Sequence, residues 1–131
     1  MNALLLTLLY FVVSIVIVLI GVGLFGLVTT KYKDWDEIAE GNSAVALSVG
    51  GKIIGLSIIL MFAILQGDTV SVTLLWGAIG VVLQIVVYLL FDLLTPKFSV
   101  QGKLKEGNMA VGIISCCVSI GLGFVIGASI T

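Results

Sequence analysis

The chain repeats a six-residue sequence motif, and each copy leads into a long apolar run. Residues 40–45 (EGNSAV) return as residues 106–111 (EGNMAV), an offset of 66 positions. The same offset links residues 54–56 (IGL) to residues 120–122 (IGL). Matches that stay in one register along a whole chain are typical of a duplicated unit. The sequence therefore predicts two tandem copies of one unit, each about half of the chain.

The amino-acid composition places these units in a membrane. Of the 131 residues, 60% are hydrophobic and 10% are charged, whereas soluble domains carry about 25% charged residues. A chain this short cannot bury so much apolar surface in its own core, so we expect that surface to face lipid. The net charge of −1 and the absence of His predict no nucleic-acid partner, no metal site and no cofactor.

Four stretches are long and apolar enough to cross a bilayer, which takes ~20 residues of helix. They are residues 3–28, 43–65, 70–94 and 109–130. Lipid offers no partners to free backbone groups, so we expect all four to be helices. The first is longer than the ~7–15-residue core of a secretory signal, which predicts a retained span. The predicted fold is an all-α membrane protein with four transmembrane helices, built as two tandem two-helix repeats, residues 1–66 and 67–131.

The lysines predict how the spans are oriented. Every Lys except Lys52 lies in one of two loops, residues 29–41 and 95–107. Short loops that carry Lys stay in the cytoplasm, so we expect both loops inside, with both termini and the turn at residues 66–69 outside. Since each unit holds an even number of spans, the two units are expected to be parallel repeats and not inverted ones.

The repeated motif is expected to start helices. Asn42 and Asn108 stand just before the second and fourth spans, where an Asn side chain can accept from the first free N–H groups. The acidic residues before them lie close to the same positive helix ends. The predicted motif comprises Glu40, Gly41, Asn42, Glu106, Gly107 and Asn108. Residues 34–38, with Trp35 and Ile38, are typical of an interfacial segment and compatible with a short helix lying flat on the membrane.

The paired Glu-Gly-Asn-x-Ala-Val motifs, the stretch from Asp92 to Pro96 (DLLTP) and the two-fold unit together resemble one family. It is the domain-of-unknown-function 350 family of small bacterial membrane proteins, also labelled UPF 0719 transmembrane proteins. The resemblance covers essentially the whole chain and implies a multi-pass protein of the bacterial inner membrane. It implies a location and no particular activity. One departure is that the first copy has Gly26 where the second has Asp92.

Polar residues inside the spans are the candidate functional site. An ionisable group at membrane depth costs ~2.5–3.5 kcal/mol on insertion scales, so Lys52 in particular needs an explanation. Helical side chains lean toward the helix N-terminus, and so Lys52 and Asp92, on antiparallel spans, lean toward each other. A Lys52–Asp92 pair is geometrically possible, within one chain or between chains. Gln84 and Tyr88 share a helix face with Asp92, which predicts one polar seam of these four residues.

The seam has three interpretations. It can be a buried structural network that fixes the register of the helices, at some expense in stability. It can be a permeation or proton path through the membrane. In the third interpretation it contacts lipid or a partner protein, or Lys52 reaches the headgroups alone.

Small residues recur every fourth position on two of the spans, and such spacing lets membrane helices approach closely. They are Gly51, Gly55, Ser115, Ser119, Gly123 and Gly127. The spacing serves either packing within the bundle or contact between subunits. Because there are more rows of small residues than the packing of four helices obviously requires, we expect a homo-oligomer. The neighbouring Cys116 and Cys117 are interpreted as small packing residues of the last span.

No nucleophile–base pair, metal-ligand cluster or phosphate-binding loop is evident, so the sequence does not predict an enzyme. Two functions remain. The favoured one is a scaffold or accessory subunit of a membrane assembly, whose cytoplasmic loops dock a cytoplasmic or membrane protein. The alternative is a small oligomeric ion channel or transporter that uses the Lys52/Gln84/Asp92 seam. Four spans with one seam leave little room for a substrate site within a monomer.

Overall fold

The computed structural model describes residues 2–29, 31–67, 69–94 and 99–130. Within these ranges, four helices are long and apolar enough to cross a membrane: α1 (Ala3–Val28), α3 (Ser43–Gln66), α4 (Val70–Leu93) and α6 (Met109–Ser129). Two short helices, α2 (Asp34–Ala39) and α5 (Val100–Lys105), precede α3 and α6. The predicted all-α membrane fold is therefore confirmed. Asp68 of the turn, and Thr95, Pro96 and Lys97 of the second loop, lie outside the described residues.

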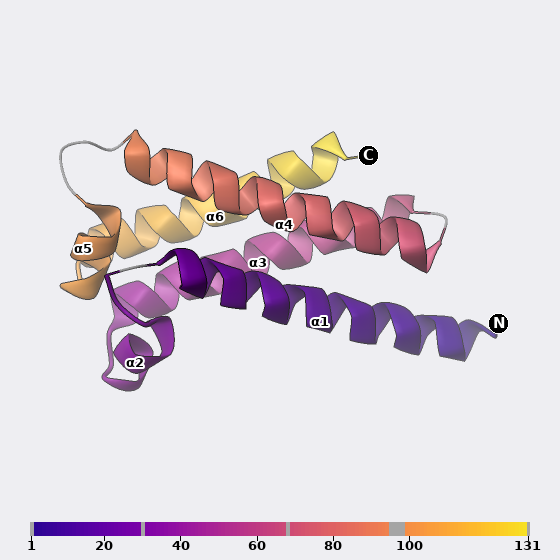
Figure 1. The fold of residues 1–131 in the computed structure, drawn as a ribbon, viewed down its shortest axis with the longest axis horizontal. Helices are drawn as coiled ribbons and strands as arrows, with labels where there is room; N and C mark the ends of the chain where they lie inside the picture. Colours follow the sequence, from indigo (N-terminus) through magenta and orange to yellow (C-terminus); the bar gives the residue numbers. More distant parts are fainter. Residues whose placement is uncertain (1, 30, 68, 95–98, 131) are drawn as a thin grey trace.

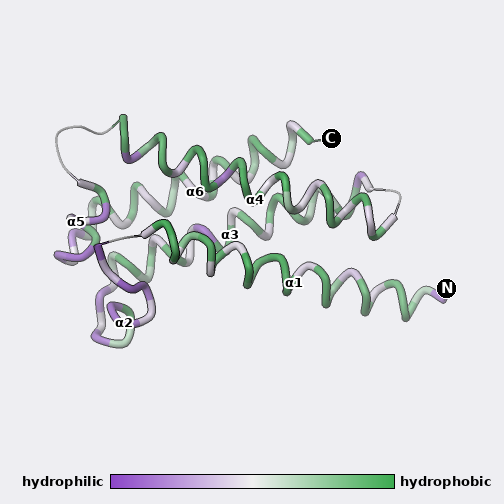
Figure 2. Tube along the Cα trace, viewed as in Figure 1, coloured by the Kyte–Doolittle hydropathy of each residue, from purple (hydrophilic) through white to green (hydrophobic). Residues whose placement is uncertain are grey.

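The long helices run antiparallel to their chain neighbours, so α2 and α5 gather at one end of the bundle and both termini lie toward the other (Figure 1). Figure 2 shows hydrophilic residues concentrated around α2 and α5 and apolar residues along the spans. The two loops are tied together, since the Lys31 ammonium donates to the Ser99 hydroxyl at 2.6 Å. Which face of the membrane carries this end stays a prediction, as does the repeat, although α2 and α5 begin at equivalent positions of the two halves.

The Glu-Gly-Asn motif forms the corner between a short helix and a long one. Glu40 ends α2, and Gly41 follows with a φ of 90°, a left-handed conformation that glycine adopts without steric cost. The N–H of Gly41 then donates to the carbonyl of Ile38, and the N–H of Asn42 donates to that of Glu37. This pair of bonds is the Schellman motif, which satisfies the last carbonyls of a helix.

Asn42 then begins the next helix, since its side-chain oxygen accepts from the N–H of Val45 at 3.2 Å. Its amide nitrogen donates to the carbonyl of Leu104 at 2.9 Å, which joins this corner to α5. The second copy repeats the local geometry, with Glu106 as C-cap, Gly107 at φ 80° and Asn108 as N-cap. The Glu-Gly-Asn motif therefore specifies the corner between two helices: Glu caps the C-terminus of the short helix, Gly takes the left-handed conformation, and Asn caps the N-terminus of the long helix.

The most extensive helix contact joins α3 to α6, and small residues make it possible. A Cβ on Gly51 would lie 2.6 Å from the Cα of Cys116, and one on Gly123 would lie 2.6 Å from the carbonyl oxygen of Gly55. Gly55 likewise faces Ser119, and Gly127 faces the ring of Phe62. The Ser115 hydroxyl hydrogen-bonds that of Ser48 at 3.0 Å. All six small residues thus pack within the chain, so these rows no longer argue for a homo-oligomer, which stays a prediction.

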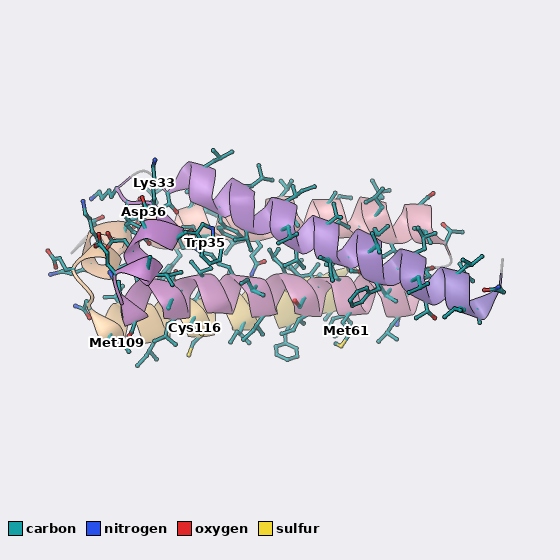
Figure 3. All side chains as sticks on the ribbon, turned by 90° about the horizontal axis from the view of Figure 1, so that it is seen from below. Lys33, Trp35, Asp36, Met61, Met109 and Cys116 are labelled. Atoms are coloured by element: carbon teal, nitrogen blue, oxygen red, sulfur yellow. The ribbon has the colours of Figure 1, made fainter. Side chains whose placement is uncertain are left out.

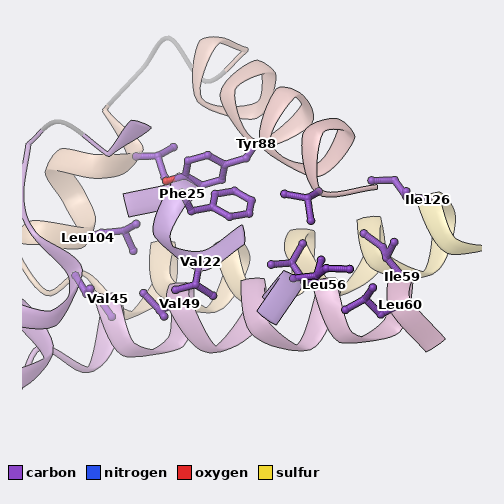
Figure 4. Packing of buried hydrophobic residues seen from close by; sticks show 14 of the residues in the cluster. Val22, Phe25, Val45, Val49, Leu56, Ile59, Leu60, Tyr88, Leu104 and Ile126 are labelled. Carbon is purple, nitrogen blue, oxygen red and sulfur yellow. The ribbon is translucent and has the colours of Figure 1, made fainter. Parts of the chain in front are cut away.

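The buried core runs along the bundle in two parts (Figure 4). Near α2 and α5 it contains the aromatic rings of Phe25 and Tyr88 with Val45, Val49 and Leu104. Toward the termini it consists of aliphatic side chains: Ile17, Leu56, Ile59, Leu60, Val81 and Ile126. The helix α1 contributes least, since 6% of its most apolar stretch is buried compared with 50% for α3. Its outer face is a continuous apolar surface of the kind that lipid covers (Figure 3).

Candidate functional site: the buried lysine of α3

Lys52 is the residue around which the candidate site is built. The helix α3 carries it into the bundle, where 1% of its surface stays exposed. Its ammonium nitrogen lies 4.3 Å from the centre of the Tyr88 ring and 5.0 Å from that of Phe25. The two rings meet edge to face, with centroids 5.5 Å apart at 85°. Each π face attracts a cation, so α1 and α4 together stabilise the charge that α3 inserts between them.

The carboxylate that acts on Lys52 comes from α2. Asp34 is the first residue of that helix and is 6% exposed. Burial raises the pKa of its carboxyl, and the positive charge of Lys52 partly offsets this increase. Tyr32, just before α2, is also buried, and its pKa is raised mainly by burial, with smaller contributions from the neighbouring Tyr88 and Asp34. A helix expected to lie at the membrane surface thus turns one acidic side chain inward.

Of the other three residues of the predicted seam, Tyr88 lies against Lys52, whereas Gln84 and Asp92 have partners elsewhere. Tyr88 is 2% exposed and lies against the ammonium, while Gln84, 1% exposed, donates its amide to the carbonyl of Ser119 at 3.1 Å. Asp92 lies at the end of α4, where its carboxylate accepts from the N–H of Val100 at 3.2 Å. It holds the start of α5, whose first N–H groups have no partner within the helix.

The suggested Lys52–Asp92 pair is not formed. Among the residues that the structure describes, Lys52 makes no ion pair and no hydrogen bond. The Asp92 carboxylate is engaged by α5, and the ammonium lies against the two rings. Of the predicted seam, Lys52 and Tyr88 are therefore in contact, and the carboxylate that acts on both is that of Asp34.

A crevice of about 300 Å³ opens beside Asp34. Its floor is α1 and its rim is the start of α2, with these lining residues: Val22, Gly23, Gly26, Lys33, Asp34, Trp35 and Asp36. Lys33, Trp35 and Asp36 lie together at that end of the molecule (Figure 3). A Cβ added to Gly26 would meet Asp34 alone, at 4.0 Å from its Oδ2. Asp34 consequently belongs both to the crevice and to the surroundings of Lys52.

On the side away from α2, closely packed aliphatic side chains follow the polar residues. A Cβ on Gly21 would lie 2.7 Å from Leu56 and 3.5 Å from Val81. Next along the bundle, Gly80 of α4 contacts Ile59 directly. A lipid-facing groove of about 490 Å³ between α1 and α3 lies outside this packing. Within the described residues, the surroundings of Lys52 thus border the crevice toward α2 and closely packed aliphatic side chains toward the termini.

The comparisons with known proteins identify the family. The profile of the family described as Domain of Unknown Function (DUF350) matches residues 1–130. The chain belongs to this family. The UPF0719 transmembrane protein YshE of Bacillus subtilis (strain 168) is 38% identical to it over 121 residues, which cover 92% of this chain and 90% of that protein. The UPF0719 inner membrane protein YjfL of Escherichia coli (strain K12) is 27% identical over 104 residues, covering 79% and 76%. No solved structure matches the chain.

The DUF350 chain is therefore a multi-pass membrane protein, as its composition predicts. Sequence reasoning missed three of the residues around Lys52, which are Phe25, Tyr32 and Asp34. A usable signal was present for Asp34. It opens a segment that ends in Glu-Gly-Asn, and a Schellman corner there requires a short helix that folds back toward the next span.

Proposed function

We propose that this DUF350 protein is a scaffold or accessory subunit of a membrane assembly and catalyses no reaction itself. The observation that carries the proposal is the apolar layer beyond Lys52. The contacts of Gly21 with Leu56 and Val81 close the bundle directly past the polar cluster. An ion or polar solute needs polar partners or water along its route, and close-packed aliphatic side chains supply neither.

The end that carries α2 and α5 supports the docking part of the proposal. Buried Val100 and Leu104 anchor α5 to the bundle, and the Lys31–Ser99 bond ties the first loop to it. Charged side chains on the outside of both short helices stay exposed, among them Lys33, Asp36, Lys105 and Glu106. Fixed charges on an ordered surface favour one partner over others through electrostatic complementarity.

An ion flux assay on purified protein in liposomes tests the proposal. We expect flux through wild type to equal that of empty liposomes, and Lys52→Met to leave folding and membrane assembly intact. In cells, a photo-crosslinking residue at position 33 or 105 should capture one and the same protein. The same residue at position 27, a lipid-facing site on α1 with 77% of Leu27 exposed, should not capture it.

The channel or transporter remains the second candidate, because a buried cation beside a carboxylate is typical of ion and proton pathways in membranes. It predicts flux through wild type that Lys52→Met and Asp34→Asn both abolish. Lys33→Met serves as the control, since Lys33 is exposed at the crevice and should leave that flux unchanged. Flux with this pattern would overturn the scaffold proposal in favour of conduction.

A further inference from the structure

Several buried polar atoms converge around Lys52 without a partner in the described chain. They are Tyr32 Oη, Asp34 Oδ1, Lys52 Nζ and Tyr88 Oη. They come from the α1–α2 connection and from α2, α3 and α4, and the residues that carry them are at most 8% exposed. Lys52 lies against Tyr88, and Asp34 interacts electrostatically with Lys52, Tyr32 and Tyr88. The unpartnered atoms therefore belong to one cluster.

The chemistry of the cluster selects its occupant. Buried polar groups in proteins are almost always hydrogen-bonded to protein or to ordered water. Lys52 offers donors only, Asp34 offers acceptors, and the two tyrosines offer both. A metal ion would satisfy the acceptors and an anion the donors, but each would leave the other half unpartnered. Water donates and accepts, and buried water typically makes about three hydrogen bonds to such groups.

The crevice beside Asp34 supplies a route for this water. Its floor at Gly26 is open up to the Asp34 carboxylate, which also faces the cluster. On the other side, Leu56 and Val81 close over Gly21. The cluster thereby borders the crevice at one side and closely packed aliphatic side chains at the other.

We propose that Tyr32, Asp34, Lys52 and Tyr88 enclose internal water that is continuous with the crevice at Asp34, and that the Lys52 ammonium exchanges protons through it. A proton that leaves Nζ passes to a neighbouring water and then to the Asp34 carboxylate or to bulk water. The reverse transfer restores the ammonium, so no other reactant is needed. Such a proton-binding site is independent of the scaffold function and requires no flux across the membrane.

The titratable groups around Lys52 come from three places. Asp34 and Glu37 lie on α2, Tyr32 precedes it, and Tyr88 and Asp92 lie on α4. The helix α1 presents the Phe25 ring, which does not titrate. Of these groups, Asp34 alone borders both the crevice and the cluster, which makes it the expected first proton acceptor.

Magnetisation transfer from water to lysine nitrogens tests the proposal in wild-type protein. The protein is labelled with ¹⁵N-lysine and embedded in bilayers, and the Lys52 signal is assigned by its loss in Lys52→Met. We expect water protons to transfer magnetisation to Lys52 Nζ, although the side chain is 1% exposed. A Lys52 signal without transfer would mean a dry cluster and would overturn the proposal.

A pair of glycine variants then tests the route. Gly26→Leu places a side chain in the crevice, whereas a Cβ added to Gly121 has none of the described atoms within 4 Å, so Gly121→Leu serves as the control. We expect Gly26→Leu to slow the transfer to Lys52 Nζ and Gly121→Leu to leave it at the wild-type rate. Equal rates in the two variants would contradict entry through the crevice. Neither result depends on ion flux, so failure here and failure of the scaffold proposal are distinguishable.

Discussion

The ammonium nitrogen of Lys52 lies 4.3 Å from the centre of the Tyr88 ring, and the edge-to-face contact of that ring with Phe25 places a second π face 5.0 Å from the same nitrogen. A charge in the middle of an apolar bundle thus lies against aromatic faces, and no carboxylate of the described residues forms an ion pair with it. This arrangement makes the ring of Tyr88, more than its hydroxyl, the important feature.

Replacing Tyr88 separates these two parts of the side chain. Tyr88→Phe keeps the ring and should change the free energy of unfolding by less than about 1 kcal/mol, because the hydroxyl has no hydrogen-bond partner among the residues that the structure describes. Tyr88→Leu removes the cation–π contact and the edge-to-face pair, which together contribute about 3 kcal/mol. Unfolding in mixed detergent micelles measures both. Equal losses in the two variants would show that the hydroxyl, and not the ring, stabilises the site.

A double-mutant cycle tests which carboxylate acts on Lys52. Lys52→Met and Asp34→Asn each leave one buried charge without its counterpart, so the double variant should be less destabilised than the sum of the two. We expect a coupling of about 0.5–3 kcal/mol. Lys52→Met combined with Asp92→Asn should be additive within about 0.5 kcal/mol, because the Asp92 carboxylate is engaged with Val100. Coupling to Asp92 alone would restore the pair suggested by the sequence.

The spans and their caps could be predicted from the sequence because each depends on local rules. Apolar length gave the four helices within one residue at each end, and Asn42 and Asn108 are N-caps because an Asn there can satisfy a free N–H. The conformation of Gly41 and Gly107 follows only once a short helix is predicted to end just before each of them, because such a helix end commonly requires a residue in the left-handed conformation.

The surroundings of Lys52 could not be predicted in the same way. Depth and helix direction both favour Asp92 as its partner. They do not reveal that α5 needs an acceptor for its first N–H groups, or that α2 folds back and buries Asp34. These are tertiary contacts between segments far apart in sequence. Residues 34–38 also include the exposed Trp35 and Asp36. Their pattern indicates a surface helix and does not indicate that Asp34 faces the bundle.

The protonation of Asp34 should depend on Lys52. Burial raises the pKa of the Asp34 carboxyl, and Lys52 lowers it in part, so Lys52→Met should raise this pKa further. The carboxyl stretching band, assigned by its loss in Asp34→Asn, reports the titration by infrared spectroscopy. Lys33→Met is the control, because Lys33 is exposed and should leave the titration unchanged. A lower pKa in Lys52→Met would contradict the electrostatic contact.

The raised pKa of Asp34 also determines how the free energy of unfolding changes with pH. The folded state holds the Asp34 proton more tightly than the unfolded chain, whose pKa is about 3.9. The stabilisation is therefore complete below that value and is lost as the pH rises through the raised pKa of the folded state. Asp34→Asn should remove this loss, so its unfolding free energy should fall less than that of wild type between acidic and neutral pH.

Neighbouring glycines of α3 give the sharpest test of helix packing. A Cβ on Gly51 would lie 2.6 Å from the backbone of Cys116, whereas nothing lies within 4 Å of one on Gly50. Gly51→Ala should separate α3 from α6 and reduce the unfolding free energy by about 1–3 kcal/mol, the usual effect of overpacking. Gly50→Ala should leave stability unchanged or raise it by up to about 1 kcal/mol, since Ala favours helix over Gly. Unfolding of both variants in the same micelles gives the comparison. If Gly50→Ala proved as damaging as Gly51→Ala, the free face of α3 would itself be a packed interface, and the case for a homo-oligomer would return.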